Sequence, residues 1–297
     1  MLQTTAEVME WIYNRGKSKR TKPGLERMEY VLERLDFPQK KIHSIHIGGT
    51  NGKGSTTNFL RNILQEAGYT VGTYTSPYFE RFEDRICING KPIAQQDLIA
   101  IANKMKPFVN ELETHSLGSP TPFEIITMIG FYFFAYIHPV DIVLVEVGLG
   151  GRYDATNVVE PFLSIITNIG HDHVHILGST LTDIAYEKAG IIKENTPVLT
   201  AVSDPEAKAV LLDEGKKIGA PVYILGETFS YTDLGPSEKG EVFSFATTSH
   251  IFNHLELSML GKHQIENASL AIMAALLLRE KTHWLIDDAA ISRGLEK

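Results

Sequence analysis

A short glycine-rich segment with one lysine separates an alternating apolar stretch from a helical pattern near the start of the chain. Its residues are Gly48-Gly49-Thr50-Asn51-Gly52-Lys53-Gly54-Ser55. Successive glycines allow backbone N–H groups to converge on phosphate oxygens, and the N-terminus of the following helix adds partial positive charge. A lysine at this place could reach the outer phosphates of a nucleotide. The segment therefore predicts a phosphate-binding loop.

The spacing in this loop differs from the common G-x-x-x-x-G-K-[ST] form. Position 47 is isoleucine, and Gly54 is inserted between Lys53 and Ser55. The alternative interpretation is a tight turn between a strand and a helix, but such a turn would not need the lysine.

An acidic residue ends the most apolar predicted strand. Residues 141–147 have no polar side chain between Asp141 and Glu146, which is typical of a central parallel strand covered on both faces. Ligands of open α/β sheets bind beyond the carboxyl ends of such strands, and magnesium prefers oxygen ligands. Glu146 is therefore a candidate metal ligand, with a strand-end residue that caps a helix as the alternative.

Two other polar clusters have less specific interpretations. His171, Asp172, His173 and His175 suggest zinc when taken alone, but no cysteine accompanies them and alternate positions on an extended stretch need not converge on one ion. The basic segment 15–22 is either a solvated loop or a site for an anionic ligand.

Composition limits the class of protein. The chain has 297 residues, 43% of them hydrophobic and 22% charged, which is typical of a globular protein. A net charge of −8 argues against a broad nucleic-acid surface. The lone Cys87 favours a reducing, cytoplasmic setting. The apolar stretch 125–137 is too short to span a bilayer and predicts a buried helix, so we expect no membrane association.

Hydrophobic periodicity predicts an alternation of strands and helices. The predicted strands are 42–47, 70–74, 141–147, 162–167, 197–202 and 221–225. The predicted helices are 5–14, 25–35, 56–67, 95–112, 122–137, 180–192, 205–218, 264–279 and 286–295. Asn89-Gly90 is a hairpin signal, and 228–259 predicts a small antiparallel addition. We expect a doubly wound, mostly parallel α/β sheet with P-loop NTPase-like topology plus a small antiparallel sheet.

The irregular loop GTNGKGS resembles that of the folylpolyglutamate synthases and dihydrofolate synthases of the Mur ligase family. Four further segments are similar to motifs of the same family, in the same order along the chain. They are residues 75–78 (TSPY), 145–157 (VEVGLGGRYDATN), 187–193 (EKAGIIK) and 261–268 (GKHQIENA). The resemblance therefore extends over most of the chain.

This resemblance implies an ATP- and Mg²⁺-dependent amide ligase. ATP activates a carboxylate as an acyl phosphate, and the amine of L-glutamate then attacks it to form an amide. Positive charge and metal must balance the transferring phosphoryl group. The expected substrate is a folate or dihydropteroate, and the resemblance does not decide between dihydrofolate synthesis and extension of the glutamate tail.

The resemblance also assigns roles to individual residues. It places Ser76, Glu146 and His173 around the magnesium ions, and it implies that Lys188 is carbamylated to supply a further ligand. Where the family commonly has a hydrophobic residue, this chain has His171, whose role stays open. Catalytic roles fall to Lys53, Lys188, Glu146 and His173. The implied ATP-binding residues are Gly49, Thr50, Asn51, Gly52, Lys53, Gly54, Ser55, Gln264 and Asn267.

The substrate side is less well marked. The resemblance places Pro23, Gly24, Thr121, Phe123 and Asp154 near the pterin, although Lys22-Pro23 departs from the family's usual residues. Phe123 suits ring stacking, but an aromatic residue on an apolar helix is more often part of the core.

Residues 1–297 are expected to form one N-terminal ATP-binding domain, a monomer, without the C-terminal Rossmann-like domain of the family. Such a domain alone should bind nucleotide weakly and ligate poorly, because half of the closed site is missing. The alternatives are another Mur-type ligase and a catalytically silent nucleotide-binding module.

Overall fold

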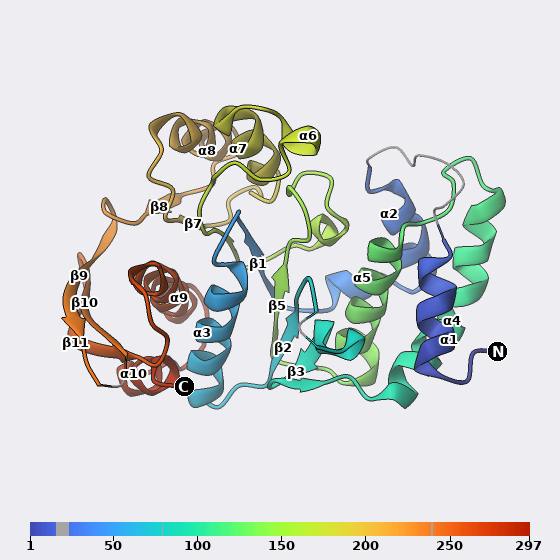
Figure 1. The fold of residues 1–297 in the computed structure, drawn as a ribbon, viewed down its shortest axis with the longest axis horizontal. Helices are drawn as coiled ribbons and strands as arrows, with labels where there is room; N and C mark the ends of the chain where they lie inside the picture. The colour runs from blue at the N-terminus through green and yellow to red at the C-terminus, as the bar shows by residue number, and fades with distance from the viewer. Residues whose placement is uncertain (16–23, 79, 239) are drawn as a thin grey trace.

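The structure, a computed structural model, describes residues 1–15, 24–78, 80–238 and 240–297. Helices pack on both faces of a central sheet, and a second, smaller sheet lies beyond one helical layer (Figure 1). The helices are α1 (Thr5–Tyr13), α2 (Glu26–Arg34), α3 (Lys53–Glu66), α4 (Gln95–Thr114), α5 (Pro122–Tyr132), α6 (Val174–Leu177), α7 (Leu181–Ala189), α8 (Pro205–Lys217), α9 (Lys262–Lys281) and α10 (Asp288–Leu295). Shorter helical segments are η1 (Pro38–Lys40), η2 (Phe82–Arg85), η3 (Phe133–Ile137) and η4 (Ala155–Val158).

The larger sheet confirms the predicted doubly wound arrangement. Within the described residues it has eight strands in the order β4-β3-β2-β5-β1-β6-β7-β8. They are β1 (Ser44–Gly48), β2 (Val71–Tyr74), β3 (Ile86–Ile88), β4 (Lys91–Pro92), β5 (Ile142–Glu146), β6 (Leu163–Ile166), β7 (Val198–Thr200) and β8 (Val222–Ile224). All neighbours pair in parallel except β3 and β4, which add an antiparallel hairpin at one edge.

The register of the three central strands aligns their carboxyl ends. Ile47 of β1 pairs with Glu146 of β5 on one side and with Ile165 of β6 on the other. The chain therefore leaves these strands at the same edge of the sheet, where ligands of open α/β folds bind. This edge brings together the phosphate loop, Glu146 and the segment that follows β6.

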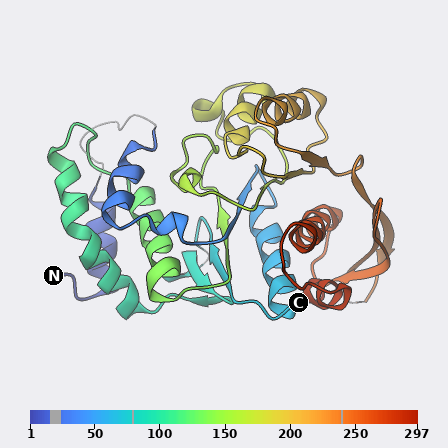
Figure 2. The same ribbon diagram turned by 180° about the vertical axis from the view of Figure 1, so that it is seen from behind.

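Three apolar clusters hold the layers together. Ile45 and Ile47 of β1 face α3 and α9, whereas Val143 and Val145 of β5 face α1, α2, α4 and α5 on the other side. A third cluster joins α7 and α8 to β6 and β7. Figure 2 shows the same layers from behind. Among the helices in the described ranges, none combines the length and apolar character needed to cross a bilayer.

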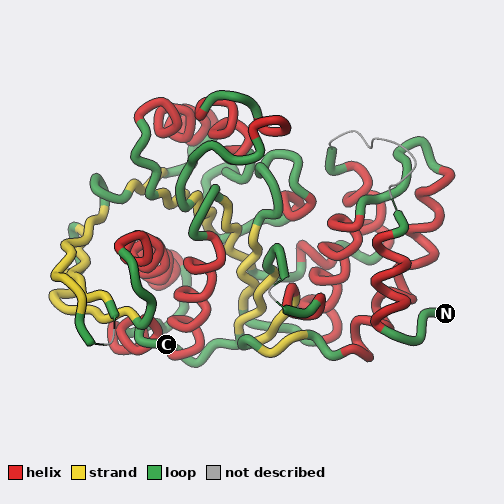
Figure 3. The backbone as a smooth tube through the Cα atoms, in the orientation of Figure 1, coloured by secondary structure: helices red, strands yellow, loops and turns green. Residues whose placement is uncertain are grey.

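The predicted antiparallel addition at 228–259 is confirmed. It consists of β9 (Phe229–Pro236), β10 (Glu241–Thr247) and β11 (Ile251–Leu257), in the order β11-β10-β9. Phe243 and Phe245 of β10 are buried in the same cluster as α9. Figure 3 shows the small sheet in yellow at the end of the molecule away from α1 and α4.

Element boundaries differ from the sequence prediction where local geometry decides. Helix α3 begins at Lys53, three residues before the predicted Thr56, because Gly52 takes a left-handed conformation (φ 83°) as its N-cap. The apolar helix after Pro122 continues past Tyr132 as π-helical turns. The short helix α6 was not predicted. The hairpin at Asn89-Gly90 is confirmed, with Ile88 paired to Lys91.

Candidate active site

The phosphate loop is held from behind by the segment after β6. The Thr50 backbone N–H donates to the Asn168 carbonyl oxygen at 2.9 Å, and the Asn51 N–H donates to Asn168 Oδ1 at 2.8 Å. Thr167 Oγ1 donates to the Asn51 carbonyl oxygen at 2.6 Å. A Cβ atom at Gly49 would lie 1.9 Å from that hydroxyl oxygen. The loop conformation is therefore fixed by direct hydrogen bonds and by the absence of a side chain at Gly49.

Helix α9 closes the loop from the other side. A Cβ atom at Gly52 would lie 2.2 Å from Asn267 Oδ1, so only glycine fits there. Asn267 Nδ2 in turn donates to Gln264 Oε1 at 3.0 Å, and both side chains are buried. By contrast, a Cβ at Gly54 would meet nothing within 4 Å. The loop thus has two crowded glycines, Gly49 and Gly52, and one glycine, Gly54, that faces open space.

Lys53 folds back over its own loop. Its Nζ donates to the carbonyl oxygens of Gly49 at 3.0 Å and Thr50 at 3.2 Å. Its position in the first turn of α3 places the ammonium beside the backbone N–H groups of the helix N-terminus. Both features give the loop a positive potential that suits a phosphate group.

Glu146 is a buried carboxylate next to the loop. It is 5% exposed. Burial raises the pKa of its carboxyl to about 7, while the positive charge of Lys53 and a hydrogen bond from the Ser76 backbone N–H oppose that rise. A carboxylate is costly to bury without a partner of opposite charge. Glu146 therefore lies beside the Ser76 backbone and within electrostatic range of Lys53, and the metal-ligand roles of Glu146 and Ser76 stay predictions.

Lys188 is buried to a similar degree on α7, with 2% of its surface exposed. Burial lowers the pKa of its ammonium to about 8; the charge of Lys53 lowers it further and the Asp172 carboxylate raises it. A substantial fraction of the amine is therefore neutral near pH 8, which is the form that reacts with carbon dioxide. The structure thus places Lys53 within electrostatic range of both Glu146 and Lys188.

The histidine cluster lies on the outer side of this group. His173 is the N-cap of α6 in a left-handed conformation (φ 44°), its side chain is 50% exposed, and its Nε2 lies 3.4 Å from Asp172 Oδ1. Among the described residues, no three His, Cys, Asp or Glu side chains are grouped to hold a metal ion. The Asp172 carboxylate lies next to His173 and acts electrostatically on Lys188. No separate role was predicted for Asp172 from the sequence.

Two of the predicted substrate residues, Phe123 and Asp154, contact Gly148. A Cβ at Gly148 would lie 2.4 Å from the Phe123 ring, so the ring rests on the backbone there. Asp154 Oδ2 accepts from the N–H groups of Gly148 at 3.1 Å and Leu149 at 2.9 Å. Asp154 Oδ1 accepts from the Thr156 N–H at 3.0 Å and hydroxyl at 2.5 Å. Four protein donors thus occupy the Asp154 carboxylate, and its contact with substrate stays a prediction.

A buried ion pair positions the neighbouring helix starts. Arg27 on α2 donates through Nε to both carboxylate oxygens of Glu124 at 3.1 Å, and Glu124 also accepts from the Thr121 N–H at 2.6 Å. This pair joins α2 to the N-terminus of α5. Gly24 lies two residues before the start of α2, in contact with the Glu26 side chain. Pro23 lies outside the described residues.

Sequence reasoning missed the residues that brace the loop. Thr167, Asn168 and Gly170 follow β6, and Gly170 exchanges hydrogen bonds with the Thr50 hydroxyl at 3.1 and 3.2 Å. The signal was available, because their strand was predicted as a neighbour in a parallel sheet and its carboxyl end must share an edge with the loop. Arg27 had no comparable signal.

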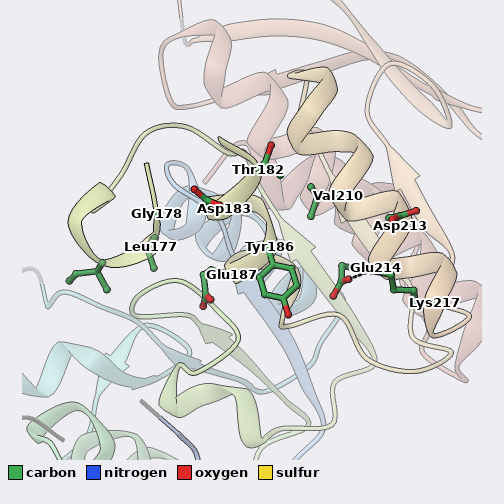
Figure 4. Close-up of a pocket in the computed structure, with 11 residues that line it drawn as sticks. Leu177, Gly178, Thr182, Asp183, Tyr186, Glu187, Val210, Asp213, Glu214 and Lys217 are labelled. Carbon is green, nitrogen blue, oxygen red and sulfur yellow. Dashed lines mark hydrogen bonds and ion pairs between the residues drawn. The ribbon is translucent and has the colours of Figure 1, made fainter. Parts of the chain in front are cut away.

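A separate pocket of about 550 Å³ lies between α7 and α8 (Figure 4). Three of its polar side chains already stabilise the fold: Asp183 caps α7, and Glu214 pairs with Arg152 at 2.9 Å and with Lys217 at 2.7 Å. None of the described residues that line it belongs to the predicted site. We therefore assign the chemistry to the loop edge of the sheet.

Comparison with known proteins identifies the family of this chain. The family model of the Mur ligase middle domain matches residues 47–275. The dihydrofolate synthase/folylpolyglutamate synthase of Bacillus subtilis is 47% identical over 297 residues, which cover 100% of this chain and 69% of that protein. The chain belongs to the folylpolyglutamate and dihydrofolate synthase branch of the Mur ligase family.

Other members of this branch extend the similarity. The folylpolyglutamate synthase of Lacticaseibacillus casei is 34% identical over 91% of this chain and 63% of its own length. The solved folylpolyglutamate synthase of Thermotoga maritima is 38% identical with a TM-score of 0.88, over 98% of this chain and 65% of that one. A solved FPGS complex with AMPPCP and folate is 32% identical with a TM-score of 0.92, over 99% of this chain and 71% of that one. The chain thus spans roughly two thirds of these relatives.

In this Mur ligase, we expect Gly52→Ala to lower the free energy of unfolding by roughly 1–3 kcal/mol, because alanine is strained at φ 83° and its Cβ would overlap Asn267. Gly54→Ala is the matched control. It should raise the free energy of unfolding by about 0.5–1 kcal/mol, because its Cβ points into open space within a helix. Urea denaturation without ligand measures both, and equal stability of the two variants would contradict this geometry.

We also expect Glu146→Gln to stabilise the metal-free protein at high pH. The folded-state pKa of about 7 exceeds the ordinary 4.5, so the stability that the bound proton gives is complete below about pH 4.5 and is lost as the pH rises through about 7. The advantage of the uncharged variant should therefore grow over this window, to about 1–3 kcal/mol at pH 8. Denaturation in chelator at pH 5 and pH 8 measures it. An advantage of equal size at both pH values would show that Glu146 is not buried as an acid.

Proposed function

We propose that this chain supplies the ATP- and Mg²⁺-binding part of an amide ligase that adds L-glutamate to a folate or dihydropteroate. The observation that carries the proposal is the grouping of Lys53, Glu146 and Lys188 beside a glycine loop at one sheet edge. The names of the relatives and the FPGS complex with AMPPCP and folate support the same activity.

The donor set suits a nucleotide with magnesium. Magnesium retains several waters and takes one or two carboxylates together with phosphate oxygens, and Glu146 and Ser76 offer that kind of partial shell. When bound, the ion would neutralise charge that develops on the transferring phosphoryl group. Gly54 leaves room at the start of α3, and Lys53 exchanges its contacts with two carbonyl oxygens for phosphate oxygens. Gln264 and Asn267 of α9 would hold the nucleotide base near Gly52.

Lys188 would complete the metal shell after carbamylation. The ammonium first loses a proton; the neutral amine then attacks carbon dioxide, a C–N bond forms as one C–O π bond breaks, and the nitrogen releases a second proton, so a cation becomes a carbamate anion. Burial favours this reaction because it lowers the pKa of the ammonium. The product would also relieve the repulsion between Lys188 and Lys53. His173, on the exposed side, would be a further metal ligand.

The folate would lie on the Phe123 side of the site. Gly24, Pro23, Thr121, Phe123 and Asp154 would surround the pterin, with the Phe123 ring as the stacking surface. We infer that the protein is a monomer. Its net charge of −8 does not suit binding to nucleic acid. The single, buried Cys87 fits a reducing compartment such as the cytoplasm.

Turnover tests the activity directly. We expect the full-length protein to release ADP only when ATP, Mg²⁺, L-glutamate and either dihydropteroate or tetrahydrofolate are all present. Lys53→Met should lower kcat at least about 100-fold, because it removes positive charge from the phosphoryl group. Glutamylated product is measured in parallel by mass spectrometry. If ADP release does not exceed the glutamate-free background, the proposed ligase activity is wrong. A catalytically silent nucleotide-binding module would then be the better interpretation.

Lys188 gives a second test. Lys188→Ala should lower turnover at least about 100-fold, because a metal ligand is lost, and short carboxylic acids such as acetate should restore part of it. Lys193→Ala is the matched control, because Lys193 is a half-buried lysine of the same segment that donates to the Asn157 carbonyl oxygen at 3.0 Å. Acetate should not change the activity of that variant. Full activity of Lys188→Ala without acid would rule out carbamylation.

A further inference from the structure

A polar ring lies in the middle of the strand that leads into the phosphate loop. His46 precedes Gly48 by two residues, and its side chain is 0% exposed. Because side chains alternate along a strand, it points away from the cluster of Ile45 and Ile47 and toward η4. A buried imidazole at this place needs a polar partner to offset its lost hydration.

That partner is Thr156, and the contact is part of a longer chain of hydrogen bonds. His46 Nε2 lies 2.8 Å from Thr156 Oγ1, and Thr156 Oγ1 lies 2.5 Å from Asp154 Oδ1. The Asp154 carboxylate already accepts three backbone N–H groups and acts as an acceptor toward the hydroxyl as well. The Thr156 hydroxyl proton therefore points to Asp154, and its oxygen accepts the His46 Nε2 proton.

The donor-to-acceptor direction of these hydrogen bonds fixes the tautomer of His46. Its Nδ1 is buried without a hydrogen-bond partner among the described residues. A bare acceptor at Nδ1 costs less than a buried donor with no acceptor, so the proton belongs on Nε2. Burial lowers the pKa of the ring to about 3, and the charge of Lys193 adds to that effect. The ring is thus neutral near physiological pH, and it acts as a hydrogen-bond donor through Nε2.

The hydrogen bonds from His46 through Thr156 to Asp154 connect two parts of the site. One end is β1, which carries the phosphate loop. The other end is the loop after β5, where Asp154 holds the N–H groups of Gly148 and Leu149. Gly148 lies two residues after Glu146 and supports the Phe123 ring. A shift of Asp154 would therefore move the backbone between the expected metal ligand and the expected folate surface.

We propose that His46 is a positioning residue for the ligase reaction, acting through Thr156 and Asp154 to set the loop between Glu146 and the folate site. The inference rests on the proposed function. His46 does not touch substrate itself, because it is wholly enclosed by the sheet and η4. Its effect is to hold the metal side and the folate side of the site in one fixed relation.

Paired substitutions in the full-length protein test this role. His46→Gln keeps an N–H donor near the position of Nε2, whereas His46→Phe keeps the ring shape without the donor. Thr156→Ser and Thr156→Val form the same kind of pair. Thr200→Val is the matched control, because Thr200 is equally buried and its hydroxyl accepts the Val202 N–H at 3.1 Å, outside this series of hydrogen bonds.

We expect His46→Phe and Thr156→Val to lower kcat roughly 10- to 100-fold, because misplacement of reacting groups by about 1 Å has effects of this size. His46→Gln, Thr156→Ser and Thr200→Val should stay within about threefold of the wild type. The Kd for nucleotide without folate should change less than about threefold in all five. Thermal unfolding confirms that each variant is folded at the assay temperature. Equal kcat for His46→Phe and His46→Gln, or an equal loss in Thr200→Val, would overturn the proposal.

A spectroscopic test does not depend on activity or on the folding of a variant. In ¹⁵N NMR of the wild-type protein, the His46 ring should remain neutral with its proton on Nε2 from about pH 5 to about pH 8. A ring that titrates in this range, or a proton on Nδ1, would overturn the chain of hydrogen bonds. A wild-type protein that forms no ADP would instead remove the proposed function and leave the NMR result intact.

Discussion

The burial of charge at one edge of the central sheet is the constraint on which the rest of the site depends. Lys53, Glu146 and Lys188 come from three different elements, and parallel pairing of β1 with β5 and β6 brings their strand ends level. Glu146 and Lys188 are both nearly enclosed, and each titrates closer to neutrality than it would in water. The unliganded protein thus carries groups that a metal ion and a phosphate would stabilise.

The loop architecture follows from this constraint. Gly49 and Gly52 allow the backbone to approach Thr167 and Asn267, so the phosphate loop is fixed between β6 and α9 before any ligand binds. On the other side, Asp154 fixes the backbone that follows Glu146. Fixed donors aimed at a phosphoryl group need no reorganisation during reaction, which is the main source of electrostatic catalysis. The parts of the fold that these contacts fix would therefore lie around the reacting groups of the proposed reaction.

Much of this arrangement could be predicted from the sequence, because its signals are local. The glycine loop, the apolar run that ends at Glu146 and the hairpin at Asn89-Gly90 each depend on neighbouring residues alone. The burial of Lys188 could not be predicted, since periodicity on a short helix does not say which neighbours cover one side chain. The same holds for the partner of Arg27, because Glu124 lies on an element far from α2 in sequence.

We propose that buried Glu146 holds a proton near neutral pH and that a bound metal–nucleotide complex would displace it. Calorimetry of MgATP binding at about pH 7, in two buffers that differ in ionisation enthalpy, counts the protons exchanged. We predict release of roughly half a proton or more by the wild-type protein, and a release smaller by about half a proton in Glu146→Gln. Proton uptake, or the same release from both proteins, would contradict it.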